Sequence, residues 1–411
     1  MNVHTGFQYS LFIALSCLLL HCNGQVNSTS ANQSTGKADK VVGGAFENRN
    51  YLYQGMPDYI TASDTSPGWR QKGPRLLITG TIYQLDGKTP APDVVLYYYH
   101  TNTEGRYVHK PGEKRTMLPN QQGQTHGYIR GWVKTNKYGQ YSLYTVRPGV
   151  YPSRDEPAHI HVSLKEPGLS VPYYIDEFVF DDDPLLTAAK RKKLPNRGGS
   201  GILRLLESGP FQVAEHNIIL GIHIPHYPQS AVVTHSSGLS IGEDQPSFTP
   251  FHAFGPDKGT RACPVCTYGR YHGILYFVGP HPDWSQIKKW ITYLEQQSRA
   301  RNAYLKAYFV YGNASDYEKN SRQHELEQMG LALHVKHVAL TFVPSFEDTA
   351  SEVNQSKINP KVDNTFIIFK NRTIIDKYIN LAPTTKNFNL LSTVLDQTKG
   401  RYFDLAEPAY H

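Results

Sequence analysis

The chain has 411 residues and a formal net charge of +7, with 39% hydrophobic and 19% charged residues. This balance excludes a disordered polyelectrolyte and a collagen-like repeat, and the length favours two domains or three small ones. Tyrosine and histidine are abundant, with 28 and 18 residues, whereas tryptophan and methionine number four each. The one basic run, residues 190–193, is interpreted as a solvated loop, so no nucleic-acid partner is predicted.

The first 24 residues have the character of a signal peptide. They contain no acidic residue, lysine or arginine, and residues 9–22 form an apolar run that is long enough for a signal-peptide core and short for a membrane span. We therefore expect an exported protein, secreted or periplasmic, that is cleaved near Gly24. Cys22 offers the alternative of a lipid anchor, and a membrane partner is expected only in that case.

Cleavage near Gly24 removes two of the four cysteines and leaves Cys263 and Cys266 in the mature chain. One CxxC pair excludes a disulfide framework. Beside an α/β pattern it is typical of a redox-active dithiol, whose partner the sequence does not identify. An inert local disulfide and a partner-docking module are the alternatives, and nearby histidines leave a zinc site open.

The middle of the chain has the pattern of an all-β domain. Residues 25–70 are rich in Ser, Asn, Gly and Gln and are expected to be flexible, with order beginning near Pro74. Residues 71–228 alternate short β-rich runs with turn signals, at the spacing of a β-sandwich. The expected strands are residues 76–85, 94–100, 141–146, 159–164 and 216–224. Residues 229–247 are interpreted as a linker.

Residues 248–411 alternate strands with helices, which predicts a second, α/β domain. The expected strands are residues 273–278, 305–311 and 338–343, with helices around 284–294 and 316–329 and a hairpin that pairs 365–370 with 373–378. Across residues 246–400 this order resembles the thioredoxin and redoxin fold. Two features depart from that resemblance, because the CxxC pair precedes the first of these strands and Asn364 stands where a cis-proline is typical.

His159 and His161 are the strongest candidates for a functional site. On a strand, side chains two residues apart point to the same face, so the two imidazoles would stand side by side as a metal site requires. A solvated or structural strand face is the alternative interpretation. Upstream, Tyr151 lies between two prolines, and Tyr107 lies in a polar loop that contains glycine. Both are unusual places for simple core aromatics.

From about residue 75 to residue 227 the sequence resembles the intradiol ring-cleavage dioxygenases, which open catechols between the two hydroxyl-bearing carbons with non-haem Fe(III) and O2. The matching segments are residues 80–93, 105–110, 139–141, 145–152, 157–161, 180–185 and 196–202. The resemblance implies Fe(III) as the cofactor, Tyr107 and Tyr151 as tyrosinate ligands, and His159 and His161 as histidine ligands. It also implies that Tyr151, opposite His161, is the ligand that the substrate displaces.

The chemistry of these side chains fits that set. A tyrosine hydroxyl has a pKa of about 10, so two tyrosinates at neutral pH require a strong Lewis acid. Anionic oxygen favours a hard trivalent metal, and two imidazoles leave one position for hydroxide, which makes the centre neutral. A catechol dianion that replaces hydroxide and Tyr151 keeps it neutral, while those two groups take the catechol protons.

Two positions depart from the family pattern. Glu156 stands where an arginine usually precedes the histidine segment, and Glu177 stands where a glutamine is common. A guanidinium near the substrate stabilises the negative charge that develops during the reaction. We therefore predict that Glu156 points away from the pocket and that Arg154 supplies the cation.

The sequence thus predicts an exported two-domain enzyme: an Fe(III)-dependent β-sandwich that cleaves a catechol-type aromatic with O2 to a muconate-type diacid, followed by a thioredoxin-like domain. Three alternatives stay open. The β-domain would capture a ligand without cleaving it, the CxxC domain would act as a thiol-disulfide oxidoreductase, or His159 and His161 would hold copper or zinc.

Overall fold

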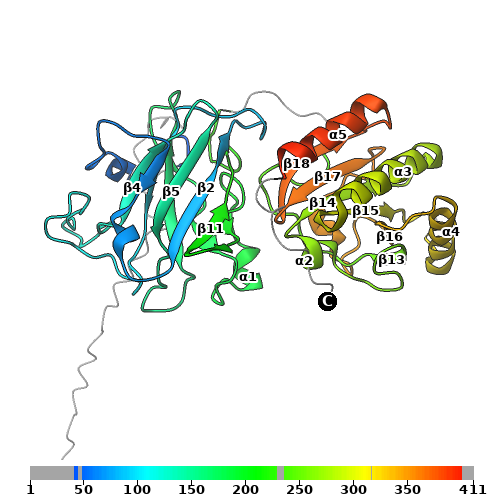
Figure 1. The fold of residues 1–411 in the computed structure, drawn as a ribbon, viewed down its shortest axis with the longest axis horizontal. Helices are drawn as coiled ribbons and strands as arrows, with labels where there is room; N and C mark the ends of the chain where they lie inside the picture. The colour runs from blue at the N-terminus through cyan, green and yellow to red at the C-terminus, as the bar shows by residue number, and fades with distance from the viewer. Residues whose placement is uncertain (1–40, 45–48, 229–235, 316, 400–411) are drawn as a thin grey trace, which may run out of the picture.

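The computed structural model describes residues 41–44, 49–228, 236–315 and 317–399. The expected signal peptide and Cys22 lie outside the described residues. Figure 1 shows two bodies, a β-rich one coloured blue to green and an α/β one coloured yellow to red. Within the described part of the chain, no helix has both the length and the apolar character that a membrane crossing needs.

The expected β-sandwich is present as two sheets. The first has the order β1 (Ser63–Thr65), β5 (Gln140–Val146), β2 (Arg75–Tyr83), β11 (Phe211–Glu215) and β10 (Leu206–Ser208), and β12 (Ile218–Ile219) also pairs with β2. The second has the order β4 (Arg130–Lys134), β3 (Val95–Tyr99), β6 (His159–Lys165), β8 (Phe178–Phe180) and β9 (Ile202–Leu203), and β7 (Tyr173–Tyr174) also pairs with β6. A short helix, α1 (Ala188–Arg191), follows β8.

Alternation along β3 and β6 separates the core of the sandwich from the outer face of the second sheet. Leu96 and Tyr98 of β3, with Ile160 of β6, belong to the core between the sheets. Tyr97 and Tyr99 of β3 belong instead to a separate aromatic cluster with Trp132 and Leu52. His159 and His161 therefore share the outer face with these tyrosines, because they alternate with Ile160.

The expectation that residues 25–70 are flexible is wrong for residues 49–70. This segment forms the 3-10 helices η1 (Arg49–Leu52) and η2 (Pro67–Arg70), and β1 between them pairs with β5. Leu52 is 1% exposed, and its carbonyl accepts a hydrogen bond from the Trp132 indole at 2.7 Å. Leu52, with the partly buried Met56 and Ile60, packs on the outer aromatic cluster, and this burial stabilises the segment together with the pairing of β1.

The second body is an α/β domain, as expected. Its sheet has the order β13 (Phe251–Phe254), β16 (Val338–Val343), β15 (Leu305–Gly312), β14 (His272–Val278), β17 (Thr365–Lys370) and β18 (Thr373–Ile379). One face packs against α3 (Trp284–Arg301), α4 (Lys319–Ala332) and α5 (Thr385–Gln397), and the other against α2 (Pro264–Tyr268) and the 3-10 helix η4 (Val353–Ser356). A third 3-10 helix, η3 (Asn302–Tyr304), leads into β15.

Strand positions were easier to predict than irregular regions. The strands expected at residues 338–343 and 365–370 match β16 and β17, and the hairpin turn at Asn371 and Arg372 has the two positive φ angles, 51° and 66°, that a two-residue hairpin loop favours. The strand expected over residues 216–224 is wrong in extent, since only β12 forms there. Glycine-containing turns at residues 220–227 replace the rest.

The interpretation of residues 229–247 as a linker is also wrong where the structure describes them. Gly242 lies between the two domains, because its carbonyl accepts from the Ser200 amide at 2.7 Å and its amide donates to the Ile374 carbonyl at 2.8 Å. Ion pairs between the domains join Lys88 to Asp376 at 2.6 Å and Lys370 to Glu215 at 3.1 Å. The segment therefore belongs to the domain interface.

Gly80 of β2 gives a direct test of the packing within the β-sandwich. A Cβ atom there would lie 1.6 Å from the His216 carbonyl oxygen, so Gly80→Ala must separate two backbone segments. We expect it to lower the free energy of unfolding by about 2 kcal/mol or more, measured by denaturant or thermal unfolding. Gly168→Ala is the matched control, because nothing lies within 4 Å of its Cβ position, and it should change stability by less than about 0.5 kcal/mol. Equal stabilities would contradict the packing of β2.

Candidate metal centre

Four donor atoms predicted from the sequence come together at the outer face of the second sheet. The hydroxyls of Tyr107 and Tyr151 are 3.1 Å apart, and the Tyr151 hydroxyl lies 3.1 Å from His159 Nε2 and 3.4 Å from His161 Nε2. The two Nε2 atoms are 3.2 Å apart. Donors around one metal ion, each at about 2.0–2.2 Å from it, are separated by about this much. The set therefore has the spacing of a metal centre.

Each tyrosine is placed by a loop that glycine allows. Gly105, with φ of +74°, packs so tightly that a Cβ atom would lie 1.7 Å from the Val150 carbonyl oxygen. Gly149 also packs tightly against the loop that carries Tyr107, since its Cβ would lie 2.3 Å from the Thr103 carbonyl oxygen. The loop that carries Tyr107 and the turn that carries Tyr151 are thus locked against each other, which brings the two phenols together.

The two histidines are oriented by hydrogen bonds at their other nitrogen. Nδ1 of His159 donates to the Pro157 carbonyl at 2.8 Å, and Nδ1 of His161 donates to the Glu177 carboxylate at 2.9 Å. With Nδ1 used as a donor, each neutral ring presents the lone pair of Nε2 to the centre. The sequence predicted both histidines as candidate ligands but did not predict either acceptor, although a carbonyl two residues before His159 is a local signal.

The electrostatics of the site favour a bound cation. Burial raises the pKa of Tyr107 well above its ordinary value, and the Tyr151 hydroxyl adds to the rise. Burial also lowers the pKa of His159, which keeps this ring in its neutral, metal-binding form. Burial alone would raise the pKa of Glu177, but the interaction with His161, whose Nδ1–H faces the carboxylate, outweighs it and lowers that pKa to about 2. Phenolate donors here therefore need a strong Lewis acid, and the donor set fits a trivalent metal such as Fe(III).

An aromatic stack that the sequence did not predict supports the site. The Tyr99 ring stacks on His161 with centroids 4.5 Å apart and on His126 with centroids 3.5 Å apart. His126 in turn is hydrogen-bonded through Nδ1 to the Tyr97 hydroxyl at 2.7 Å. The pairing of Tyr99 with His161 in the β3–β6 register is the feature that determines this stack. The His161 ring is thus held on one face by the Tyr99 ring and at Nδ1 by the Glu177 carboxylate.

Arg154 and Glu156 both lie in the exposed turn between Tyr151 and His159. Arg154 has a φ of +56°, and its amide donates to the Tyr151 carbonyl at 2.9 Å, which closes the turn. The exposure of Glu156 agrees with the expectation that it points away from the donor cluster. The role predicted for the Arg154 guanidinium stays a prediction.

Cys263 and Cys266 form a disulfide, with Cα atoms 5.3 Å apart, at the start of α2. Cys266 is exposed, whereas Cys263 is partly buried against the core on the face of the sheet that α2 covers. The pair lies in the α/β domain, and the four donors of the candidate metal centre all come from the β-domain. No sulfur therefore takes part in that cluster.

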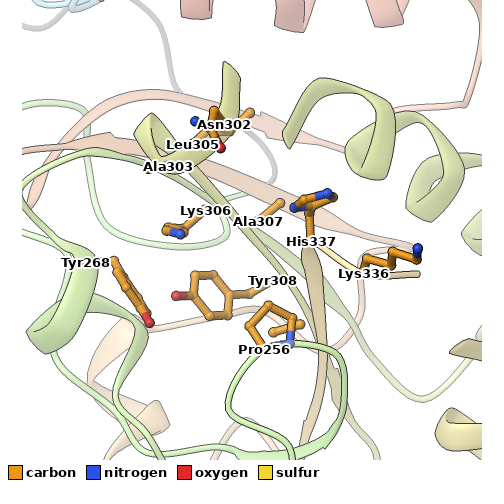
Figure 2. Close-up of a pocket in the computed structure, with 11 residues that line it drawn as sticks. Pro256, Tyr268, Asn302, Ala303, Leu305, Lys306, Ala307, Tyr308, Lys336 and His337 are labelled. Carbon is orange, nitrogen blue, oxygen red and sulfur yellow. The ribbon is translucent and has the colours of Figure 1, made fainter. Parts of the chain in front are cut away.

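The α/β domain also has a pocket of about 250 Å³ where β15 and β16 begin. Figure 2 shows its lining, which includes Tyr268, Lys306, Tyr308 and His337. The Lys306 ammonium lies over the Tyr268 ring at 4.9 Å, and Tyr308 is 2% exposed. Burial raises the pKa of Tyr308 well above its ordinary value. The lining contains one histidine, His337, so it lacks the pair of imidazoles on which the donor cluster of the β-domain is built.

Comparisons with known proteins find similarity over part of the chain. No protein-family profile matches the chain. The chain is 32% identical over 120 residues to the protocatechuate 3,4-dioxygenase beta chain of Burkholderia cepacia, covering 28% of this chain and 48% of that one. It is 27% identical over 154 residues to the catechol 1,2-dioxygenase of Acinetobacter baylyi, covering 31% and 46%. The chain thus spans about half the length of the curated relatives it matches.

Solved structures with similar parts include hydroxyquinol 1,2-dioxygenase from Pseudomonas putida, at 20% identity and a TM-score of 0.30, covering 46% of this chain and 67% of that one. Another is an intradiol ring-cleavage dioxygenase from Tetranychus urticae, at 18% identity and a TM-score of 0.28, covering 46% and 95%. The sequence matches to the two curated dioxygenases support a relationship, at low identity and over part of the length, to the intradiol ring-cleavage dioxygenases.

Proposed function

We propose that the β-domain binds Fe(III) and cleaves a catechol-type aromatic between its two hydroxyl-bearing carbons with O2, giving a muconate-type diacid. The observation that supports this most strongly is the convergence of two phenol oxygens and two imidazole nitrogens within 3.1–3.4 Å of their neighbours. The similarity to dioxygenases of protocatechuate and catechol points to the same chemistry.

The roles of the residues follow from their accessibility. His159 and His161 are buried at 7% and 4% exposure, whereas Tyr107 and Tyr151 are both partly exposed. A substrate therefore approaches on the tyrosine side. Tyr151 is the proposed ligand that gives way, and its phenolate oxygen takes one of the two catechol protons. Tyr107, His159 and His161 stay in place as the permanent supports.

When bound, Fe(III) supplies the Lewis acidity that holds the catechol as a dianion and prepares its ring for reaction with O2. The protein must then keep this neutral complex in a dry, shaped site. The aromatic rings of Tyr97, Tyr99 and Trp132 with the buried Leu52 form such surroundings beside the histidines. Export of the chain also belongs to this proposal and would bring the enzyme to extracellular or periplasmic aromatics.

The direct test is metal analysis of the purified full chain, followed by O2 uptake with a panel of catechols. We expect stoichiometric iron, O2 consumption and a ring-opened diacid. An iron-loaded protein that binds catechols without consuming O2 would favour the alternative of a binding module. Stoichiometric zinc or copper after expression with adequate iron would contradict the assignment of the metal.

Removing either phenol should change the colour of the protein. Tyrosinate bound to Fe(III) gives a charge-transfer band in the visible spectrum, so Tyr107→Phe or Tyr151→Phe should weaken or shift it. Tyr138→Phe is a matched control, because this tyrosine is 57% exposed and outside the site. An unchanged spectrum in both site variants would contradict the tyrosinate ligands.

Arg154→Ala tests the proposed source of positive charge near the substrate. We expect catechol turnover to fall by more than about tenfold, which corresponds to roughly 1.4 kcal/mol of transition-state stabilisation, with iron content retained. Arg106→Ala serves as a control, since Arg106 is an exposed arginine next to Tyr107. Unchanged turnover in Arg154→Ala would assign this role to another group.

The α/β domain is proposed to be thioredoxin-like. A βαβ unit formed by β14, α3 and β15 and a terminal β17–β18 hairpin followed by α5 support this relationship. The exposed Cys266 in the Cys263–Cys266 disulfide favours thiol-disulfide exchange as a second candidate function. Reduction of insulin disulfides by the full chain would test this function. If no activity is found, the pair is interpreted as an inert structural disulfide.

The two candidate functions should be separable. Replacing both cysteines, Cys263→Ala with Cys266→Ala, should leave iron content, colour and catechol cleavage intact, because no sulfur belongs to the donor cluster. Any disulfide-reducing activity should disappear in the same protein. If the double variant stays folded but loses its iron colour, the claim that the disulfide and the metal centre act independently is wrong.

A further inference from the structure

Glu177 lies beside the donor cluster, on the far side of one of its histidines. In the antiparallel pairing of β6 with β8, Ile160 is opposite Phe178, so the next residue of β6, His161, faces Glu177 just before β8 begins. The Glu177 carboxylate accepts the Nδ1–H of His161 at 2.9 Å. The side chain is 29% exposed, whereas the His161 side chain is 4% exposed. A carboxylate at the edge of the site thus contacts a buried imidazole.

Two roles fit a carboxylate in this place. It could be a third metal ligand, because ligand atoms of His159, His161 and Glu177 all lie within 4.8 Å of one another. Two histidines and one carboxylate are indeed a ligand set of non-haem iron. It could instead be an acceptor that holds His161 without touching the metal.

The contacts of His161 separate these roles. Its Nε2 lies 3.2 Å from His159 Nε2 and 3.4 Å from the Tyr151 hydroxyl, whereas Glu177 is bonded to Nδ1. These two nitrogens are on different edges of the imidazole ring and point in different directions. A carboxylate bonded to Nδ1 is therefore directed away from the point that the four donors share. The geometry favours the outer position.

We propose that Glu177 is a positioning residue for the metal centre, which rests on the proposed Fe(III) site. It fixes the His161 ring in the plane set by its stacking on Tyr99, with Nε2 toward the metal. It also makes His161 a stronger donor than His159, whose Nδ1 bonds to the neutral carbonyl of Pro157. The carboxylate also places a negative charge next to the centre without binding the metal, which stabilises Fe(III) more than Fe(II).

This role predicts separate effects of hydrogen bond and charge. Glu177→Gln keeps an oxygen that accepts from Nδ1 but removes the charge, whereas Glu177→Ala removes both. The amide variant should therefore retain iron, with its Fe(III)/Fe(II) midpoint potential shifted to more positive values because Fe(III) loses stabilisation. The alanine variant should bind iron about 10–100-fold more weakly. Glu207→Gln is the matched control, since Glu207 is an exposed carboxylate on β10 of the other sheet, and it should change neither quantity.

The experiment measures iron affinity by chelator competition and the midpoint potential by spectroelectrochemistry on the full chain, with circular dichroism to confirm folding. Loss of iron from the folded Glu177→Gln variant would overturn the proposal and make Glu177 a ligand. Wild-type affinity and potential in both variants would also overturn it. A wild-type protein that binds iron without a tyrosinate band contradicts the proposed function. In that case the iron affinities of the Glu177 variants still decide whether Glu177 is a positioning residue.

Discussion

The candidate site depends on one strand that is paired on both sides. β6 directs Ile160, Val162 and Leu164 into the core of the sandwich, so His159 and His161 must emerge on the opposite face. Slipping the register by one residue would bury both imidazoles and expose the core, which is too costly to occur. The packing of the sandwich therefore fixes the position of the two histidines before any metal is bound.

The same register supplies the surroundings of His161. β3 places Tyr99 against the ring, and the approach to β8 places Glu177 at Nδ1. The two tyrosine donors come from outside this sheet, on loops whose close contact at Gly105 holds the phenols 3.1 Å apart. The site thus combines two histidines from a rigid strand with two tyrosines from loops. Under the proposed function, the strand-borne His159 and His161 stay fixed together with Tyr107, and the loop-borne Tyr151 gives way to a substrate.

Sequence patterns predicted the parts of this arrangement that depend on local alternation. The His-x-His spacing on a strand, the two tyrosines near glycine and proline, and the β-rich and α/β halves all follow from side-chain period and turn chemistry. The ordered structure of residues 49–70 could not be predicted, because it depends on a contact between Leu52 and Trp132, which are 80 residues apart in the sequence. The Glu177 contact likewise depends on strand register, and the place of Gly242 depends on how two domains meet.

The most direct test of the central claim is a resonance Raman spectrum of the iron-loaded full chain, excited within its visible band. Two tyrosinates on Fe(III) should give enhanced phenolate vibrations, and part of these should disappear in Tyr107→Phe and a different part in Tyr151→Phe. A protein that binds one iron per chain but shows no enhanced phenolate vibrations would contradict the account, because Tyr107 and Tyr151 would then not be ligands.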